Sequence, residues 1–196
     1  MELFVPRAYN PTVDRLVLPV RLNELGPGRP NKSARDQLAA LSSESLCAPH
    51  AVRDAAAAAA CLAGLWLYHD FLDESHALSQ ELATIEGSYW HGILHRREPD
   101  YANAKYWFRR VGEHAIGPDL ATSGRKWAAQ SSLDKQSRFL AEQTAWDHFR
   151  FVDLCEAAAA GRSSAADLCR QIQLCEWFLL FDHCWRQACS QAEDER

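Results

Sequence analysis

The sequence lacks the segments that mark membrane and exported proteins. Its longest apolar run, from Ala55 to Tyr68, is too short and too rich in alanine to span a bilayer. The first residues, MELFVPRAYNP, contain no basic region followed by an apolar one, so we expect no signal peptide. These features lead us to expect a cytoplasmic protein without a membrane partner.

Cysteine motifs for structural zinc are also missing. The chain has seven cysteines, an odd number, and no two are spaced as Cys-x2-Cys. Spacings such as Cys169 to Cys175 and Cys184 to Cys189 match no zinc ribbon or finger. Most of the cysteines lie in apolar helical patterns, where cysteine behaves as a small hydrophobic residue. We therefore expect buried, reduced thiols, as in other cytosolic proteins.

An excess of positive charge is absent. The 21 lysines and arginines are outnumbered by 26 aspartates and glutamates, which gives a formal net charge of -5. This balance argues against a protein that nucleic acid holds through bulk electrostatics, although a local basic patch can form on an acidic surface. We expect any anionic partner to bind locally and specifically.

Strand patterns and internal repeats are missing too, because no segment alternates apolar and polar residues over a run rich in β-branched side chains. A chain of 196 residues with 47% apolar content can bury one core. Prolines and glycines are dense in residues 1–32 and exclude a long helix there, whereas VDRLVLPVRL is apolar enough to pack as an extended arm. The sequence predicts an all-α, single-domain helical bundle over residues 33–196, with an irregular arm of residues 1–32 packed on it.

Helix signals divide the first half of this body. Pro49 opens a pattern that runs to Glu86, where Gly87 can end it. A short helix is predicted from about residue 88 to residue 98. Asp100 can cap a third helix, ANAKYWFRRV, which Gly112 terminates.

The second half begins with a predicted loop over residues 115–131, because Gly117, Pro118 and Gly124 interrupt it. Helices are then predicted from residue 132, from about residue 146 to residue 160, and after Ser164. The last helix is apolar nearly all round, as expected of a buried element.

The histidines form two helical stripes between residues 69 and 98. On the first helix, four polar residues follow at i, i+4, i+7 and i+11 and share one narrow face: His69, Asp73, His76 and Gln80. On the next, three follow at i, i+4 and i+7: His91, His95 and Glu98. Because consecutive helices fold back on one another, we expect the two stripes to line a common groove.

Imidazoles and carboxylates on facing helices are the ligands that a divalent transition metal, such as zinc, iron or manganese, takes in a helical bundle. The predicted metal ligands are His69, Asp73, His76, His91, His95 and Glu98, and the predicted catalytic residues among them are His76, His91, His95 and Glu98. The His-x3-His spacing is common in helices, and the glutamate that marks a zinc protease is missing. Hydrogen-bonded core histidines and a metal-free acid/base role are therefore alternatives.

A block of basic and aromatic residues follows directly. Such a surface can grip phosphate or carboxylate groups and stack a planar ring. Its predicted ligand-binding residues are Arg96, Arg97, Lys105, Tyr106, Arg109 and Arg110. The alternative is structural: Arg96 or Arg97 pairs with a nearby carboxylate of Glu86, Glu98 or Asp100 and braces two helices.

Four sequence blocks carry a resemblance to a known family. They read LWLYHDFLDESHALSQ, GSYWHGILHRREPDYANAKYWFRRVGEH, WDHFRFVDLCE and QLCEWFLLFDHC. Together they resemble a group of uncharacterised bacterial proteins, with more distant fungal relatives, that carry an HRREPDYxNAKYWFRRVG signature. The resemblance covers roughly residues 60 to 185 and implies no reaction, substrate or cofactor. His148 stands where the family pattern has a proline after Trp-Asp, which leaves the start of that helix less well defined.

Two classes of function follow from these patterns. The first is a small-molecule-binding protein or an enzyme, a metal-assisted hydrolase or oxidase, that acts on an anionic ligand in a groove lined by histidine, glutamate and arginine. The second is a non-catalytic module that docks a protein or nucleic-acid partner through residues 96–110. The sequence leaves the oligomeric state open.

Overall fold

The structure is a computed structural model, which describes residues 9–189. Within this range the protein forms eleven α-helices and one short 3₁₀-helix, and it contains no β-strand. The elements are α1 (Pro11–Val17), η1 (Lys32–Ala34), α2 (Arg35–Ala39), α3 (Ser43–Cys47), α4 (Ala55–Tyr68), α5 (Leu72–Ser79), α6 (Ile85–Arg97), α7 (Tyr101–Val111), α8 (Gly117–Ala128), α9 (Phe139–Glu142), α10 (His148–Ala159) and α11 (Ala166–Ala188). The predicted all-α fold is confirmed.

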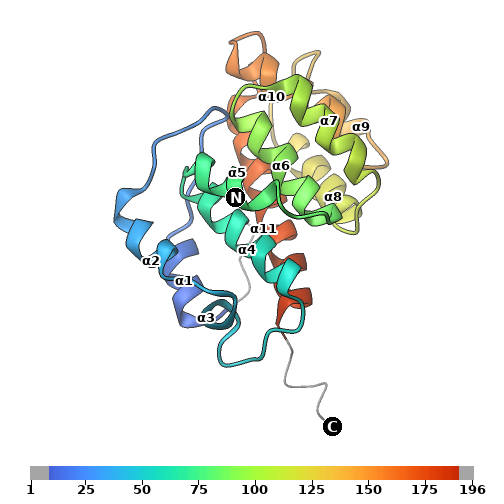
Figure 1. Cartoon of the computed structure of the whole chain (residues 1–196). Helices are drawn as coiled ribbons and strands as arrows, with labels where there is room; N and C mark the ends of the chain where they lie inside the picture. The colour runs from blue at the N-terminus through green and yellow to red at the C-terminus, as the bar shows by residue number, and fades with distance from the viewer. Residues whose placement is uncertain (1–8, 190–196) are drawn as a thin grey trace.

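The last helix, α11, is the central element of the bundle (Figure 1). It packs on α4 along one part of its length and on α8 and α10 along another. Two groups of buried apolar side chains result, one around α4, α6 and α11 and one around α8, α10 and the start of α11, and Leu179 contacts both. Because α11 serves both groups, it is buried on most of its circumference, as the sequence predicted.

The N-terminal arm is partly helical. Asn10 caps α1 because its side chain accepts hydrogen bonds from the backbone amides of Thr12 and Val13. Pro11 is the first residue of the helix, a position whose backbone nitrogen makes no hydrogen bond within the helix, so the missing N–H of proline costs nothing there. The first part of VDRLVLPVRL is therefore a helix and not the extended segment that the sequence predicted. Val13 and Val17 are buried, which attaches the arm to the main core.

The long helix predicted from Pro49 to Glu86 is wrong, because the chain breaks between α4 and α5. Asp70 has φ +62°, a left-handed conformation that cannot continue a helix. Gly87 ends no helix but lies in the first turn of α6, where its amide donates to the Thr84 cap. A Cβ at Gly87 would come 2.4 Å from the Cβ of Leu82, so glycine is required by close packing there.

The loop predicted over residues 115–131 is also wrong. Pro118 lies in the first turn of α8, where proline is favoured, so it starts a helix and does not interrupt one. A Cβ at Gly124 would lie in ordinary contact with Trp146 and Leu140 and 3.2 Å from Nε2 of Gln143, so this face of α8 packs on the segment around α9. Tertiary packing therefore overrides the low helix propensity of glycine in this segment.

A disulfide joins Cys47 at the end of α3 to Cys189 just after α11. An isolated bridge between Val52 and Cys189 ties the same two chain segments together. The prediction of reduced thiols is wrong for this pair, since their 142-residue separation gives no local signal. The remaining five cysteines are free and buried.

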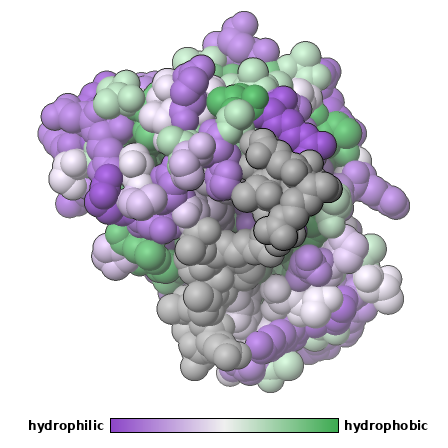
Figure 2. All heavy atoms as spheres, turned by 90° about the horizontal axis from the view of Figure 1, so that it is seen from below, coloured by the Kyte–Doolittle hydropathy of each residue, from purple (hydrophilic) through white to green (hydrophobic). Residues whose placement is uncertain are grey.

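The described surface is mainly polar. In the view of Figure 2, hydrophilic residues cover most of the visible described surface, and hydrophobic ones appear in small separate groups. Large exposed apolar side chains are scattered over α1, the arm, α6, α7 and α10: Leu18, Leu22, Ile85, Tyr106 and Phe149. No helix within residues 9–189 has the length and apolar character that crossing a membrane requires.

Candidate metal centre

Three histidines from two neighbouring helices converge beside the core. His76 comes from the last turn of α5, and His91 and His95 lie one turn apart on α6. Each offers one ring nitrogen, and the three nitrogens lie within 4.8 Å of one another. In a tetrahedral zinc site the ligand nitrogens are about 3.3 Å apart, so modest side-chain rotations would close the set.

The three rings already contact one another. The centroids of His76 and His91 are 4.6 Å apart, those of His91 and His95 4.7 Å, and those of His76 and His95 5.4 Å. The face of His91 is also covered by the indole of Trp107, with centroids 4.1 Å apart and an interplanar angle of 20°. Packing therefore fixes the ring planes before any ligand arrives.

Ser79 orients the His91 ring. Its hydroxyl donates to the carbonyl of His76 (3.4 Å), and its oxygen faces Nδ1 of His91 at 3.4 Å. The tautomer that satisfies both contacts has the hydroxyl donating to the carbonyl and Nδ1 of His91 donating to the serine oxygen. In this tautomer neutral His91 carries its proton on Nδ1 and an unshared electron pair on Nε2.

Glu98 has the same effect on His95. A carboxylate oxygen of Glu98 lies 3.1 Å from Nδ1 of His95, and a carboxylate only accepts hydrogen bonds, so Nδ1 is the donor. The free pair on Nε2 faces the side-chain amide nitrogen of Asn103 at 3.0 Å. A histidine that donates through one nitrogen to a carboxylate and binds a metal through the other is the usual arrangement in metal centres.

The electrostatic environment keeps His91 and His95 neutral. Burial lowers the pKa of His91 to about 4, and the neighbouring His95 and His76 lower it further by disfavouring a second positive charge. Burial also lowers the pKa of His95, although Glu98 opposes the shift. Neutral imidazole is the form that binds a metal ion, so no proton has to be displaced near pH 7.

Access to the cluster is from one side. His91 and His95 are buried, whereas His76 is only partly buried and the Glu98 side chain is 29% exposed. A ligand would therefore reach the nitrogens past His76 and Glu98.

Two predicted metal ligands do not join the cluster. His69 ends α4 and lies under the arm, where its Nδ1 is 3.0 Å from the amide nitrogen of Asn31. Asp73 is exposed and lines a surface cleft with Phe71 and Glu74. The prediction that His69 lies on one helix face with Asp73 and His76 is wrong, because it assumed a continuous helix and the break at Asp70 separates α4 from α5.

Arg96 is buried in an ion pair and does not face a ligand. Its guanidinium lies 2.5 Å from a carboxylate oxygen of Glu176, and both side chains are almost fully buried. The hydroxyl of Tyr89 donates to the other oxygen of Glu176 (3.1 Å), and the ring of Phe151 lies under the guanidinium at 4.7 Å. Glu176 is on α11, 80 residues from Arg96. Arg96 therefore has the structural role that the sequence offered as an alternative, but its partner is not one of the nearby carboxylates that the sequence suggested.

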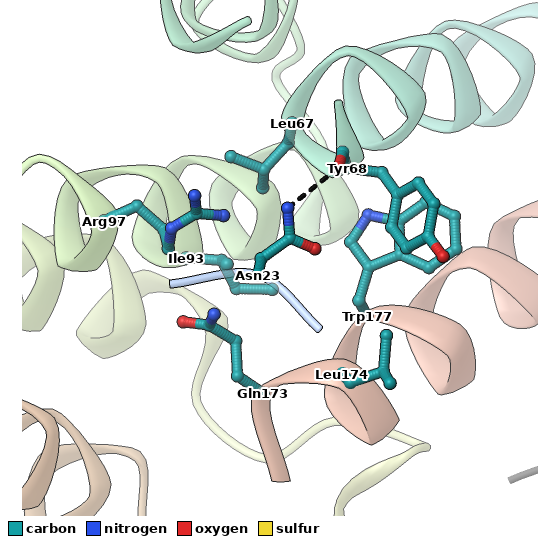
Figure 3. Close-up of a pocket in the computed structure, with 8 residues that line it drawn as sticks. All are labelled: Asn23, Leu67, Tyr68, Ile93, Arg97, Gln173, Leu174 and Trp177. Carbon is teal, nitrogen blue, oxygen red and sulfur yellow. Dashed lines mark hydrogen bonds between the residues drawn. The ribbon is translucent and has the colours of Figure 1, made fainter. Parts of the chain in front are cut away.

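Arg97 holds the N-terminal arm. It donates to Asp70 (2.6 Å) and to the carbonyl of Gly26 (2.7 Å). Figure 3 shows Arg97 in a small pocket with Asn23, whose side chain donates to the Tyr68 carbonyl. The guanidinium of Arg97 thus donates its hydrogen bonds within the protein, where they hold the arm, and it is unavailable to an external anion.

The rest of the basic block lies on α7. Lys105 pairs with Asp153 of α10, and Tyr106, Arg109 and Arg110 are exposed. The guanidinium of Arg110 lies 5.2 Å from the centroid of the Trp107 ring, the ring that stacks on His91. Arg110 is therefore the predicted ligand-binding residue that the structure connects to the histidines.

The structure also brings together a second group of potential ligands that no sequence pattern indicates. These are Glu86, His114 and His183, whose ligand atoms lie within 4.8 Å of one another. These residues come from three elements and share no helical spacing. Asn103 and Ser79, which contact the histidine rings, were missed for the same reason: each acts through a tertiary contact.

Comparisons with protein-family models, with curated proteins and with solved structures gave no match.

Proposed function

We propose that the protein binds a divalent transition metal, zinc in the first place, through His76, His91 and His95, and that this centre serves hydrolysis of a small molecule. The observation that supports the proposal best is the orientation of His91 and His95. Oxygen atoms of Ser79 and Glu98 lie beside Nδ1 of the two rings, so Nε2 of each can serve as the ligand atom once Asn103 leaves Nε2 of His95. Core histidines that merely satisfied one another would use both nitrogens in mutual or backbone hydrogen bonds.

Three imidazoles with an open fourth position are typical of catalytic zinc, which lowers the pKa of a bound water to about 7 and so supplies a nucleophile. The chain's own residues have distinct roles in such a centre. Glu98 fixes His95 and, being partly exposed, is placed to accept a proton from solvent. Asn103 donates to Nε2 of His95 in the metal-free protein and must turn its amide aside when a metal binds. We propose hydrolysis before oxidation because three histidines with a bound water are the ligand set of a catalytic zinc, and zinc is redox-inactive.

An anionic group on the substrate would meet Arg110. This side chain lies beside Trp107, which forms one wall of the histidine cluster, and Arg109 adjoins it on the exposed surface of α7. Arg96 and Arg97 are excluded from this role by their buried partners. We therefore reduce the proposed anion-binding set to Arg109 and Arg110.

The test is hydrolysis of a panel of activated carboxylic and phosphate esters by the zinc-loaded protein. We expect turnover that His95→Ala abolishes and that Arg110→Ala weakens through KM. His50→Ala and Asp73→Ala are matched controls, because both residues are exposed and outside the cluster. Equal turnover in the His95 variant, or a wild-type chain that binds no metal, would overturn the proposal.

The alternative is a docking module that uses the exposed part of the basic block. Tyr106, Arg109 and Arg110 form an exposed surface on α7 that a protein or nucleic-acid partner could contact. Affinity for a polynucleotide that falls steeply with salt and is lost in Arg109→Ala/Arg110→Ala would favour this function.

A cytoplasmic location stays a prediction. The Cys47–Cys189 disulfide weighs against it, because disulfides persist mainly in oxidising compartments. Thiol alkylation in acid-quenched cells, followed by mass spectrometry of the two cysteines, would measure the state of this pair directly.

A further inference from the structure

A second cluster of ligand-type side chains lies at the opposite end of α6 from Glu98. Glu86 is in the first turn of α6, His114 lies between α7 and α8, and His183 is in the last part of α11. We propose that Glu86, His114 and His183 form a second divalent-metal site. This site shares no residue with the histidine cluster and does not depend on the proposed function.

The geometry brings both imidazoles to one carboxylate oxygen. Oε1 of Glu86 lies 3.3 Å from Nε2 of His183 and 3.9 Å from Nε2 of His114, and the two ring centroids are 4.8 Å apart. Two imidazoles and one carboxylate are the protein ligands of many iron(II), manganese and catalytic zinc sites. A cation placed between the three atoms would replace the protons that link them in the metal-free protein.

The carboxylate supplies a ligand oxygen between the two rings. The Glu86 side chain is 18% exposed, so the carboxylate lies at the edge of the core and not deep within it.

One wall of this site is rigid and the other is open. The His114 side chain is only 4% exposed, and the ring of Tyr89 packs on it with centroids 5.1 Å apart. The His183 side chain is 23% exposed, and the flexible amide of Gln187 lies 3.0 Å from its Nε2. Coordination positions on the His183 side would thus be left for water or a small ligand.

One contact makes this site weaker than the histidine cluster. The amide of Ile116 donates to Nδ1 of His114 at 3.3 Å, which puts the proton of the neutral ring on Nε2. Metal binding at Nε2 requires the proton to move to Nδ1, so the contact with Ile116 must be given up. At His95 no proton has to move, because Nδ1 already donates to Glu98, and only the contact of Nε2 with Asn103 is given up.

The experiment is a Zn²⁺ titration of the full metal-free chain against a chromophoric chelator. We expect two equivalents to bind, the second more weakly. Glu86→Gln and His183→Ala should each weaken the second step at least about 10-fold and leave the first unchanged. Glu81→Gln is the matched control, since Glu81 is an exposed glutamate in the turn before α6.

His76→Ala separates this inference from the proposed function, because it should affect the first step alone. A second step that persists in His76→Ala and disappears in Glu86→Gln supports the second site even if the first site fails. A wild-type chain that binds a single equivalent, lost in His76→Ala, overturns the second site. Unchanged binding of both equivalents in Glu86→Gln and His183→Ala overturns it as well, and circular dichroism at each step verifies that the variants are folded.

Discussion

Glu98, the C-terminal cap of α6, reaches back one turn and places its carboxylate 3.1 Å from Nδ1 of His95. This contact determines which nitrogen of His95 carries the proton. Because Nδ1 donates to the carboxylate, the electron pair of the neutral ring is on Nε2, where the side-chain amide nitrogen of Asn103 lies 3.0 Å away. The same logic applies to Ser79 and His91, so two of the three rings are oriented before a metal binds.

Glu98→Gln should weaken zinc binding roughly 10- to 100-fold, because the amide that replaces the carboxylate supports the donor on His95 less well. The measurement is a competition titration with a chelator at pH 7. Asp100→Asn is the matched control: Asp100 lies 3.9 Å from the same nitrogen, beyond hydrogen-bond distance, and asparagine keeps its capping role. Similar losses in both variants would mean that general charge, and not orientation, is responsible.

Acid should destabilise the metal-free protein over a pH range that the pKa values of its buried histidines determine. The pKa of His91 and of His69 is lowered to about 4 and that of His148 to about 3, mainly by burial. In the unfolded chain the histidine pKa values are near 6.5, so these residues bind protons at a pH at which the folded chain keeps them neutral. The free energy of unfolding therefore falls as the pH drops. The fall begins near pH 6.5 and continues to about pH 4, whereas stability is insensitive to these groups above pH 7.

Urea unfolding between pH 7 and pH 5, in the presence of a chelator, measures this dependence. His148→Asn should reduce the proton uptake on unfolding by about one, because the titrating group is lost while an acceptor for the Trp146 indole is kept. His50→Gln should leave the slope unchanged, because His50 is exposed. A wild-type slope of zero across this range would contradict the buried, neutral state of these rings.

Glu176→Gln should destabilise the protein by about 3–5 kcal/mol, because it leaves the buried Arg96 charge without a partner. The double variant Arg96→Met/Glu176→Leu should recover much of this loss, since neither charge is then buried. Glu156→Gln is the control, because the pair of Glu156 with Arg162 is exposed and worth less than about 1 kcal/mol. Chemical denaturation measures the free energy of unfolding of the three variants. A smaller loss of stability in Glu176→Gln than in Glu156→Gln would refute the role of the buried pair.

Gly28→Ala should destabilise the attachment of the arm by roughly 1–3 kcal/mol. Gly28 has φ +73°, and a Cβ there would lie 2.7 Å from the carboxylate carbon of Asp70. That carboxylate accepts hydrogen bonds from Arg97, Arg21 and Asn23, so its displacement would loosen the whole arm.

Gly26→Ala is the matched control for this prediction. Its Cβ would meet nothing within 4 Å, and its φ is not left-handed. Hydrogen exchange of the arm amides should therefore accelerate in the Gly28 variant alone. Equal exchange in both variants would exclude Asp70 as the anchor of the arm.

The sequence predicted features that depend on local spacing. His91 and His95 are four residues apart on one helix, so their common face could be inferred, and the fold class followed from the apolar pattern. The caps at Asp100 and Gly112 were placed correctly for the same reason: each acts within a few residues of its own position.

Features that depend on tertiary contacts were predicted less well. Asp70 breaks the long helix because Arg97, Arg21 and Asn23 bind its carboxylate, and none of these partners is close in sequence. Glu176 was not recognised as the partner of Arg96, which made Arg96 a predicted ligand-binding residue. Gly117, Pro118 and Gly124 predict a loop, whereas in the structure Pro118 stands in the first turn of α8 and the helix continues through Gly124 to pack on α9 and α11.

The most direct test of the central claim is X-ray absorption at the zinc edge of the protein loaded with one equivalent, together with the metal affinity of three single variants. The account predicts a first shell of three imidazole nitrogens near 2.0 Å. It also predicts a large loss of affinity in His76→Ala and His91→Ala and none in Asp73→Ala, the control from the same helix as His76. A shell with fewer than two imidazoles, or the same affinity in all three variants, would contradict it.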